Sequence, residues 1–442
     1  MERMENLIEE IKMISSVFNR KKHAVRRDRH RKKAETGSGL GKKLPFLLKF
    51  YLQFFLLKSV FILFFRVRLM QKERWVILFR TDHLGDLLCS VSAIKHFAEY
   101  YHRQGMKIAV VTDTPYQDLA RRLVPSLDRV IAIRRDGAVS NIFYRLCFLI
   151  PFYRLRIFSV ISLPIRLNLP FVETFLFARE CHCILYEYEK TPLYVQRYLR
   201  FYSGIHSFVP LVSVHDQNEK MFREITGEPS AYEPLDLKAL LPDWKRRGNE
   251  IPEPGKYYVV LPGGSSSKNC WQPEKFAFII NAVQKEFPDC KAVILGSRQE
   301  RQREKNVLAH LQEPDSVLPL CGKTTLEECF AWIRDAAFTV SNDSGGVHIA
   351  AGYQIPSFVI FHGVTFGLCV PNPYYTQAVY FHHQRECFCC MGNSSCFNDT
   401  SDLPWPCLRD IQAGEVWEKM KPRVLSILKR HRQDALPEKH VR

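Results

Sequence analysis

An alternation of short buried strands with amphipathic helices, which begins at Trp75, constrains the fold of this sequence more than any other feature. Short continuous apolar runs between polar turns are typical of strands buried on both faces, and a three-to-four-residue period is typical of the helices that cover them. The first series of strands is expected at 75–79, 107–113, 129–133 and 158–163. A second series follows a polar stretch at 242–255, with strands at 257–262, 291–296, 338–343 and 357–363 and helices near 273–286, 299–311, 325–334 and 346–352. Two such series predict an α/β protein with two doubly wound parallel sheets facing a cleft, and ligands should bind at the carboxyl ends of the strands.

The length of 442 residues allows two or three domains, each with its own core. Apolar residues make up 46% and charged residues 25%, a globular balance that excludes a disordered or fibrous protein. We expect an extension over 1–72, a first domain over 73–240, and a second over 241–442 with a cysteine-rich segment at 387–407 and a terminal helix. Residues 1–30 contain no short apolar stretch after a basic start, so we expect an intracellular protein with reduced cysteines.

The basic charge of the chain is concentrated in its extension. The formal net charge is +17, and residues 1–74 hold 19 Lys and Arg against 7 Asp and Glu. The rest of the chain is nearly neutral, which argues against a basic catalytic groove and favours contact of the extension with an anionic surface, a membrane or a nucleic acid. No nucleic-acid-reading motif accompanies the basic arm, so we expect residues 20–70 to contact an anionic membrane surface and not a nucleic acid.

An apolar segment at 44–65 ends this extension, and as a helix it would span about 33 Å, the thickness of a bilayer core. Lys49, Gln53 and Lys58 lie inside it, and both flanks are basic, so the charge asymmetry that orients a spanning helix is missing. A helix lying in the membrane interface fits both observations best. A true span and a helix that packs on a core or a partner remain as alternatives.

Three strand-to-helix turns carry the residues suited to chemistry. Asp86 closes the turn after the first strand, where it can be a helix cap or a carboxylate that takes a proton from an acceptor hydroxyl. The second turn follows the strand at 257–262, and its small residues and lysine suit a phosphate, although it can also be a plain polar loop. The candidate residues of this second turn are Gly263, Gly264, Ser265 and Lys268.

The third turn leads from the strand at 338–343 into a helix. Gly345 and Gly346 allow a ligand to approach the helix N-terminus, where the dipole and the free N–H groups favour a pyrophosphate. Asp343 can then hold sugar hydroxyls, whereas a capping Asp with a buried His348 is the structural alternative. Outside this turn, Glu300 can accept from ribose hydroxyls or be an exposed helix-start residue, and Thr324 precedes the helix at 325–334.

Five motifs in order together resemble glycosyltransferase family 9, the heptosyltransferases of lipopolysaccharide core assembly, from about residue 74 to about 430. They are RTDHLGD, PGGSSSKNCWQPEKFA, LGSRQE, CGKTTLEECFAWIRDA and SNDSGGVHIAAG. The resemblance implies the GT-B fold, with an acceptor domain first and a nucleotide-sugar domain second. It also implies that Asp86 is the catalytic base, Lys268 binds donor phosphate and Glu300 binds ribose. Asp343, with Ser344 and the turn through His348, would bind the donor sugar and pyrophosphate.

The resemblance implies an inverting transfer of a sugar, heptose from ADP-heptose, to a lipopolysaccharide core or related glycan. No Asp-x-Asp occurs in the chain, so we expect catalysis without a metal ion or other cofactor. The alternatives are another nucleotide sugar, a protein acceptor, or an inactive, membrane-tethered partner protein of the same fold. The expected location is the cytoplasmic side of the bacterial inner membrane, as a peripheral protein with a lipid-linked or glycan acceptor.

Five of the 14 cysteines fall within 21 residues, in the pattern C-x-C-C-x5-C-x10-C. Cys387, Cys390, Cys396 and Cys407 could supply four thiolates to a structural Zn²⁺, although the spacing matches no standard zinc finger. Free thiols and disulfides are the alternatives. The autotransporter heptosyltransferases, a branch of the family that the chain resembles, carry an iron-binding cysteine set, which makes iron the second candidate metal.

Overall fold

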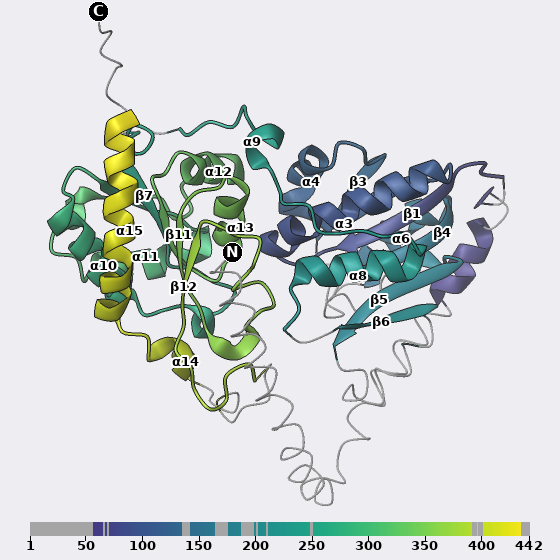
Figure 1. The fold of residues 1–442 in the computed structure, drawn as a ribbon. Helices are drawn as coiled ribbons and strands as arrows, with labels where there is room; N and C mark the ends of the chain where they lie inside the picture. The colour runs from purple at the N-terminus through teal and green to yellow at the C-terminus, as the bar shows by residue number, and fades with distance from the viewer. Residues whose placement is uncertain are drawn as a thin grey trace, which may run out of the picture. The chain divides into compact units, whose positions relative to one another are not determined.

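The computed structural model describes residues 56–64, 67–68, 70–134, 142–163, 176–186, 199, 202–208, 211–247, 251–390, 396 and 401–434. Two compact units divide the chain between residues 233 and 234. Each unit contains one six-stranded, all-parallel sheet with helices around it, which confirms the expected fold class of two doubly wound α/β domains (Figure 1).

The N-terminal unit is built on a sheet with the strand order β3-β2-β1-β4-β5-β6. Its strands are β1 (Arg74–Arg80), β2 (Lys107–Asp113), β3 (Arg129–Ile133), β4 (Arg156–Ser162), β5 (Glu180–Tyr186) and β6 (Gly204–Phe208). Its helices are α3 (Leu84–Arg103), α4 (Gln117–Leu123), α6 (Ile142–Tyr153) and α8 (Val214–Thr226), with a 3-10 turn η1 (Thr114–Tyr116). The strand order reverses between β1 and β4, and in such sheets ligands bind at this switch point.

The core of this unit is formed by the apolar strand residues that the sequence pattern singles out, and β1 is buried from Trp75 to Arg80. Residues 56–64 are helical, and this short helix packs on the same core. Leu57 is completely buried, and the partly buried Val60, Phe61 and Phe64 also contact the core. The sequence allows three positions for 44–65: in the membrane interface, across the membrane, or packed on a core or partner. One face of the helix at 56–64 packs on the core. Residues 44–55 and 65 lie outside the described residues. None of the helices that the structure describes is both long and apolar enough to cross a membrane.

The C-terminal unit has the strand order β12-β11-β10-β7-β8-β9. Its strands are β7 (Tyr257–Leu261), β8 (Lys291–Ile294), β9 (Val317–Pro319), β10 (Thr339–Asn342), β11 (Ser357–Ile360) and β12 (Ala378–Phe381). Its α-helices are α9 (Leu237–Leu240), α10 (Pro273–Glu286), α11 (Arg301–Leu308), α12 (Leu326–Arg334), α13 (Gly345–Gly352), α14 (Pro406–Arg409) and α15 (Ala413–Asp434). The 3-10 turns are η4 (Ser267–Asn269), η5 (Arg298–Glu300), η6 (Pro314–Ser316) and η7 (Gly363–Thr365).

The switch point of this second sheet lies between β7 and β10, which pair in register from Thr339 opposite Val259. The loops that follow these two strands are the second and third turns singled out in the sequence. The terminal helix α15 packs along α10, and Lys421 of α15 forms an ion pair with Glu286 of α10 at 2.6 Å. The sequence pattern did not indicate β5, β6, β9 or β12, because these strands are short or interrupted by polar residues.

Candidate active site

Asp86 lies in the first turn of α3, directly after the carboxyl end of β1. Its Oδ2 accepts a hydrogen bond from the His83 backbone N–H at 3.2 Å, so the carboxylate does cap the helix, as the structural alternative predicts. Its Oδ1 lies 3.3 Å from Nη2 of Arg80, and 24% of the side chain remains exposed. The carboxylate is therefore held in place by two partners while part of it can still be reached by a ligand.

Arg80 is the residue that organises this turn, and sequence reasoning did not assign it a role. It is the last residue of β1 and only 1% exposed. Its Nε donates to the carbonyl oxygen of Asp86 at 3.0 Å, and its Nη1 donates to that of Leu163 at 2.8 Å. Because Leu163 follows β4, Arg80 ties the carboxyl ends of β1 and β4 together at the switch point.

The loop after β7 is held by the side chain of Asn342, the last residue of β10, which is completely buried. The amide Nδ2 donates to the carbonyl oxygens of Pro262 and Gly263 at 2.7 and 3.1 Å. The amide Oδ1 accepts from the backbone N–H of Trp271 at 2.9 Å. Asn342 thus joins the second and third turns. Its position is a sequence signal, because a polar residue at the end of a buried apolar strand needs hydrogen-bond partners. This signal could have identified Asn342.

Glu300 lies against glycines from two neighbouring strands. A Cβ atom on Gly263, which follows β7, would lie 1.3 Å from Oε1 of Glu300, and one on Gly296, which follows β8, would lie 2.9 Å from Oε2. Only glycine at 263 leaves room for this carboxylate. Glu300 also accepts a hydrogen bond from the backbone N–H of Ser297 in a capping box. It is therefore also a helix-start residue, which was the alternative to ribose binding in the sequence analysis.

Lys268 and the rest of its loop are fixed by Trp405, which is distant in sequence. The Trp405 backbone N–H donates to the Lys268 carbonyl oxygen at 3.0 Å, and its indole Nε1 donates to Oδ1 of Asn269 at 2.9 Å. The Lys268 ammonium lies 4.7 Å from the centre of the indole ring, a cation–π contact. Asn269 in turn donates to the hydroxyl of the exposed Ser265 at 2.8 Å. No signal in the sequence pointed to Trp405.

The buried thiol of Cys270 packs against the same loop. A Cβ on Gly264 would lie 3.0 Å from Sγ of Cys270, so the backbone approaches this thiol closely. Burial raises the pKa of Cys270 to about 11, so the thiol stays protonated at neutral pH and contacts the Ser266 carbonyl oxygen at 3.1 Å.

The third turn opens α13 with Ser344 as its N-cap residue, and the Ser344 side chain makes no capping hydrogen bond. Asp343 and Gly345 are half-buried. Gly346 is buried, and a Cβ there would lie 2.5 Å from Cδ1 of Leu261, so this glycine lets α13 pack directly on β7. A helix N-terminus that its own N-cap side chain does not cover suits an anion.

His348 and Thr324 are placed differently from the other candidates. His348 is 5% exposed, and its Nδ1 lies 2.6 Å from the hydroxyl of Tyr375. It is therefore a buried histidine, as the structural alternative in the sequence analysis predicts. Thr324 is half-buried and comes one residue before Thr325, the N-cap of α12 that forms a capping box with Glu328.

The candidates from 263 to 300 and from 343 to 346 gather at the carboxyl ends of β7, β8 and β10, whereas Asp86 belongs to the other unit.

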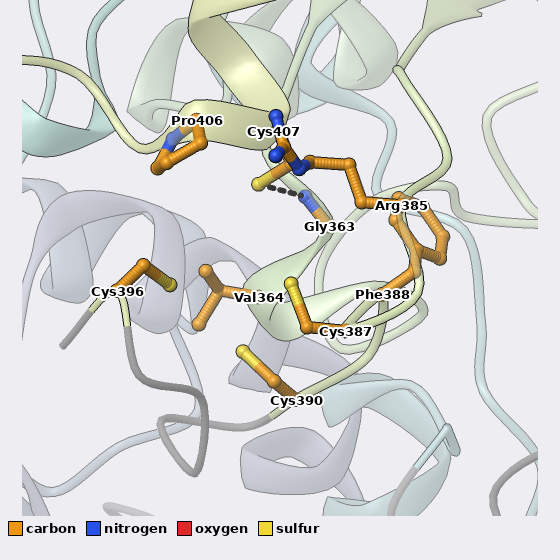
Figure 2. Close-up of a pocket in the computed structure, with 9 residues that line it drawn as sticks. All are labelled: Gly363, Val364, Arg385, Cys387, Phe388, Cys390, Cys396, Pro406 and Cys407. Carbon is orange, nitrogen blue, oxygen red and sulfur yellow. Dashed lines mark hydrogen bonds between the residues drawn. The ribbon is translucent and has the colours of Figure 1, made fainter.

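A separate cavity of about 240 Å³ in the C-terminal unit brings the four candidate metal-binding cysteines together (Figure 2). Cys387, Cys390, Cys396 and Cys407 all line it. Sγ of Cys407 accepts from the backbone N–H of Gly363 at 3.3 Å. In the described part of the chain the cysteines form no disulfide, and no three His, Cys, Asp or Glu side chains there are arranged closely enough to hold a metal ion.

Comparison with known proteins identifies the family. Residues 178–400, about half of the chain, match the family model described as glycosyltransferase family 9 (heptosyltransferase). This chain therefore belongs to glycosyltransferase family 9.

Individual relatives agree with this assignment. The chain is 29% identical to lipopolysaccharide heptosyltransferase 1 of Campylobacter coli over 108 residues, which are 24% of this chain and 32% of that protein. The alignments to the curated relatives thus span only about a third of their length.

Solved structures match over most of their length. The E. coli ADP-heptose lipopolysaccharide heptosyltransferase II aligns with a TM-score of 0.58 and 16% identity, over 80% of this chain and 99% of that one. E. coli heptosyltransferase WaaC with ADP aligns with a TM-score of 0.54 and 16% identity, over 80% and 99% of the two chains. At this identity the likeness establishes the fold alone.

Proposed function

We propose that this chain is an inverting glycosyltransferase that moves a heptose from ADP-heptose to a lipopolysaccharide core or related cell-surface glycan. The observation that carries the proposal is the meeting of two glycine-containing loops at the switch point between β7 and β10, where Asn342 joins them. This arrangement offers backbone N–H groups, one lysine and a partly exposed carboxylate to a nucleotide sugar. The family assignment and the ADP in the WaaC structure favour ADP-heptose as the donor.

Each residue has a defined task in this reaction. An acceptor hydroxyl attacks the anomeric carbon of the donor, a new carbon–oxygen bond forms, and the bond to the pyrophosphate oxygen breaks with its electron pair. Asp86 takes the hydroxyl proton. Lys268 and the N–H groups at the start of α13 stabilise the charge that develops on the leaving ADP. Glu300 holds the ribose and Asp343 the sugar hydroxyls.

The test is nucleotide release by the purified full-length chain from ADP-, GDP- and UDP-sugars, with lipopolysaccharide core acceptors present. Asp86→Asn keeps an oxygen that can accept from His83 but cannot act as a base, so we expect a loss of about 10²–10⁴ in turnover with an unchanged fold. Lys268→Ala should reduce turnover, whereas Lys291→Ala, an exposed lysine at the opposite end of the sheet, should not.

The outcomes separate the alternatives. ADP release that Asp86→Asn abolishes supports the proposal. Nucleotide release from a different sugar donor would change the proposed donor, and transfer only to a protein would change the proposed acceptor. In both cases the protein would still be a glycosyltransferase. Silence with every donor from a folded protein would favour an inactive partner protein. Turnover that persists in EDTA is the result expected for metal-independent chemistry.

We also propose that Cys387, Cys390, Cys396 and Cys407 bind one structural metal ion, zinc or iron. Four thiols around one cavity are a donor set that suits either metal, and Cys389, inside the Cys387-to-Cys390 turn, has a left-handed backbone with φ of 60°. The N–H group of Gly363 would support the Cys407 thiolate. Binding requires the sulfurs to move closer together than they lie in the structure.

We place the reaction at the cytoplasmic face of the bacterial membrane, on a lipid-linked acceptor, because the basic extension suits an anionic surface.

A further inference from the structure

The described residues between 56 and 70 carry exposed apolar side chains that the proposed catalysis does not use. Of the eleven large hydrophobic side chains exposed in the described residues, five lie between positions 56 and 70. They are Leu56, Ile62, Leu63, Val67 and Met70, with Leu63 77% and Met70 81% exposed. Soluble proteins rarely expose so many large apolar groups in so short a segment, and such patches mark interaction sites.

The opposite face of the same segment is firmly attached to the N-terminal domain. The Phe61 ring lies 5.5 Å from that of Tyr153 and 4.9 Å from that of Phe177. Leu57 is completely buried in the core. Leu56, Ile62 and Leu63 therefore lie on a helix whose other face already packs on the core, so rotation of the helix would not bury them without exposing that face.

Arg68 anchors the end of the segment. It is 7% exposed, and its guanidinium donates to the carbonyl oxygens of Ile157, Leu176 and Phe177 at 3.1 to 3.3 Å. Burial lowers its pKa to about 10, which leaves it charged at neutral pH. With both the helix and Arg68 fixed, the exposed apolar groups are presented from a rigid base.

The charge around this surface points to one kind of partner. Lys58 is exposed on the same helix, and residues 1–74 hold 19 basic against 7 acidic residues. An apolar surface that carries an exposed lysine, in a segment of sequence with a net positive charge, matches the interface of a bilayer that contains anionic lipids. There, apolar side chains enter the acyl boundary and lysines meet headgroups.

We propose that Leu56, Ile62, Leu63, Val67 and Met70, together with Lys58, form a lipid-docking surface through which the N-terminal domain binds an anionic membrane. The helix at 56–64 lies along the membrane with only its outer face in lipid, because its inner face stays on the protein core. The inference does not depend on the donor chemistry, and its test does not use transferase activity.

The experiment is flotation of the full-length chain with vesicles of phosphatidylcholine alone or mixed with phosphatidylglycerol. We expect binding to the anionic vesicles, and a fall of about tenfold or more in the partition coefficient for the double variant Ile62→Ser, Leu63→Ser. Phe278→Ser and Leu425→Ser, which remove exposed apolar groups from the other unit, are the matched controls and should bind normally. Lys58→Glu should reduce binding to anionic vesicles more than it reduces binding to neutral vesicles. Thermal unfolding checks that each variant is folded.

Three results would overturn the proposal. The first is normal binding by the Ile62→Ser, Leu63→Ser variant. The second is a loss of binding when residues 1–55 are deleted, combined with continued binding by the double serine variant. Residues 1–55 would then be the membrane anchor. The third is binding that appears only after this deletion, which would mean that residues 44–55 cover the surface in the intact chain.

Discussion

The guanidinium of Arg80 holds Asp86 at two points, through an ion pair of 3.3 Å with the carboxylate and a hydrogen bond of 3.0 Å from Nε to the carbonyl oxygen. The cation at the end of β1 therefore fixes both the backbone and the side chain of the proposed base. A third contact, to Leu163, extends this to the end of β4. The geometry of the base depends on a buried charge that belongs to the sheet.

Replacement of Arg80 should damage both folding and turnover. Arg80→Met removes the donors to two carbonyl groups and leaves the Asp86 carboxylate without its cationic partner, so we expect a loss of about 2–4 kcal/mol in the free energy of unfolding. Arg80→Lys should restore part of the turnover because it keeps the charge. Arg103→Met, at a 62% exposed arginine in a surface ion pair, is the control and should change stability little. Urea unfolding and steady-state kinetics measure both effects, and a fully active Arg80→Met would contradict this role.

Gly263→Ala should raise the donor KM, because the new methyl group would lie 1.3 Å from Oε1 of Glu300 and must displace that carboxylate. We expect the donor KM to rise about tenfold or more, which is the effect of losing the proposed hydrogen bond between the Glu300 carboxylate and the ribose. In the Glu300→Ala background the same glycine substitution should have little further effect, because the overlapping group is gone. A double-mutant cycle on the donor KM tests this, and additive effects would argue against the contact.

The C-terminal domain should lose stability in acid because of His362. This side chain is 5% exposed, and burial lowers its pKa to about 4 from an ordinary value of 6.5. The unfolded chain binds a proton to this residue below pH 6.5 while the folded chain does not, so the free energy of unfolding decreases as pH falls from 6.5 to 4. The maximum contribution is about 3 kcal/mol. His362→Gln should flatten this part of the pH–stability curve, whereas His383→Gln, at an exposed histidine, should leave it unchanged.

The cysteine pocket should bind about one metal ion per chain. We expect metal analysis of protein purified under reducing conditions to find zinc or iron, and Cys407→Ser to lose it together with part of the thermal stability of the C-terminal domain. Cys147→Ser changes an exposed thiol elsewhere and should keep the metal. A metal-free wild-type protein whose stability is unaffected by chelators would leave these residues as plain thiols.

The position of most residues of the proposed donor site could be predicted from the sequence, because these residues lie at or near the ends of strands. Gly263 and Asp343 lie just after the ends of β7 and β10, and Lys268 lies further along the loop that follows β7. Parallel strands bring their carboxyl ends to one edge of the sheet. Arg80 and Asn342 also stand at strand ends, yet their roles were missed. What they bind, the carbonyl oxygens of Leu163 and of Pro262, is not encoded near them in the sequence.

The alternation of strands and helices, and with it the two parallel sheets, follows from the sequence, because burial periodicity is a local property of the chain. Which distant groups meet depends on the tertiary packing. Trp405 reaches the loop of Lys268 from 137 positions away, and His348 turns inward onto Tyr375. The mainly apolar helix at 56–64 buries Leu57 and exposes Leu63, although both are leucines, so composition alone cannot predict the difference. Such contacts depend on how whole elements pack, since a side chain's surroundings come from segments that the local pattern does not specify.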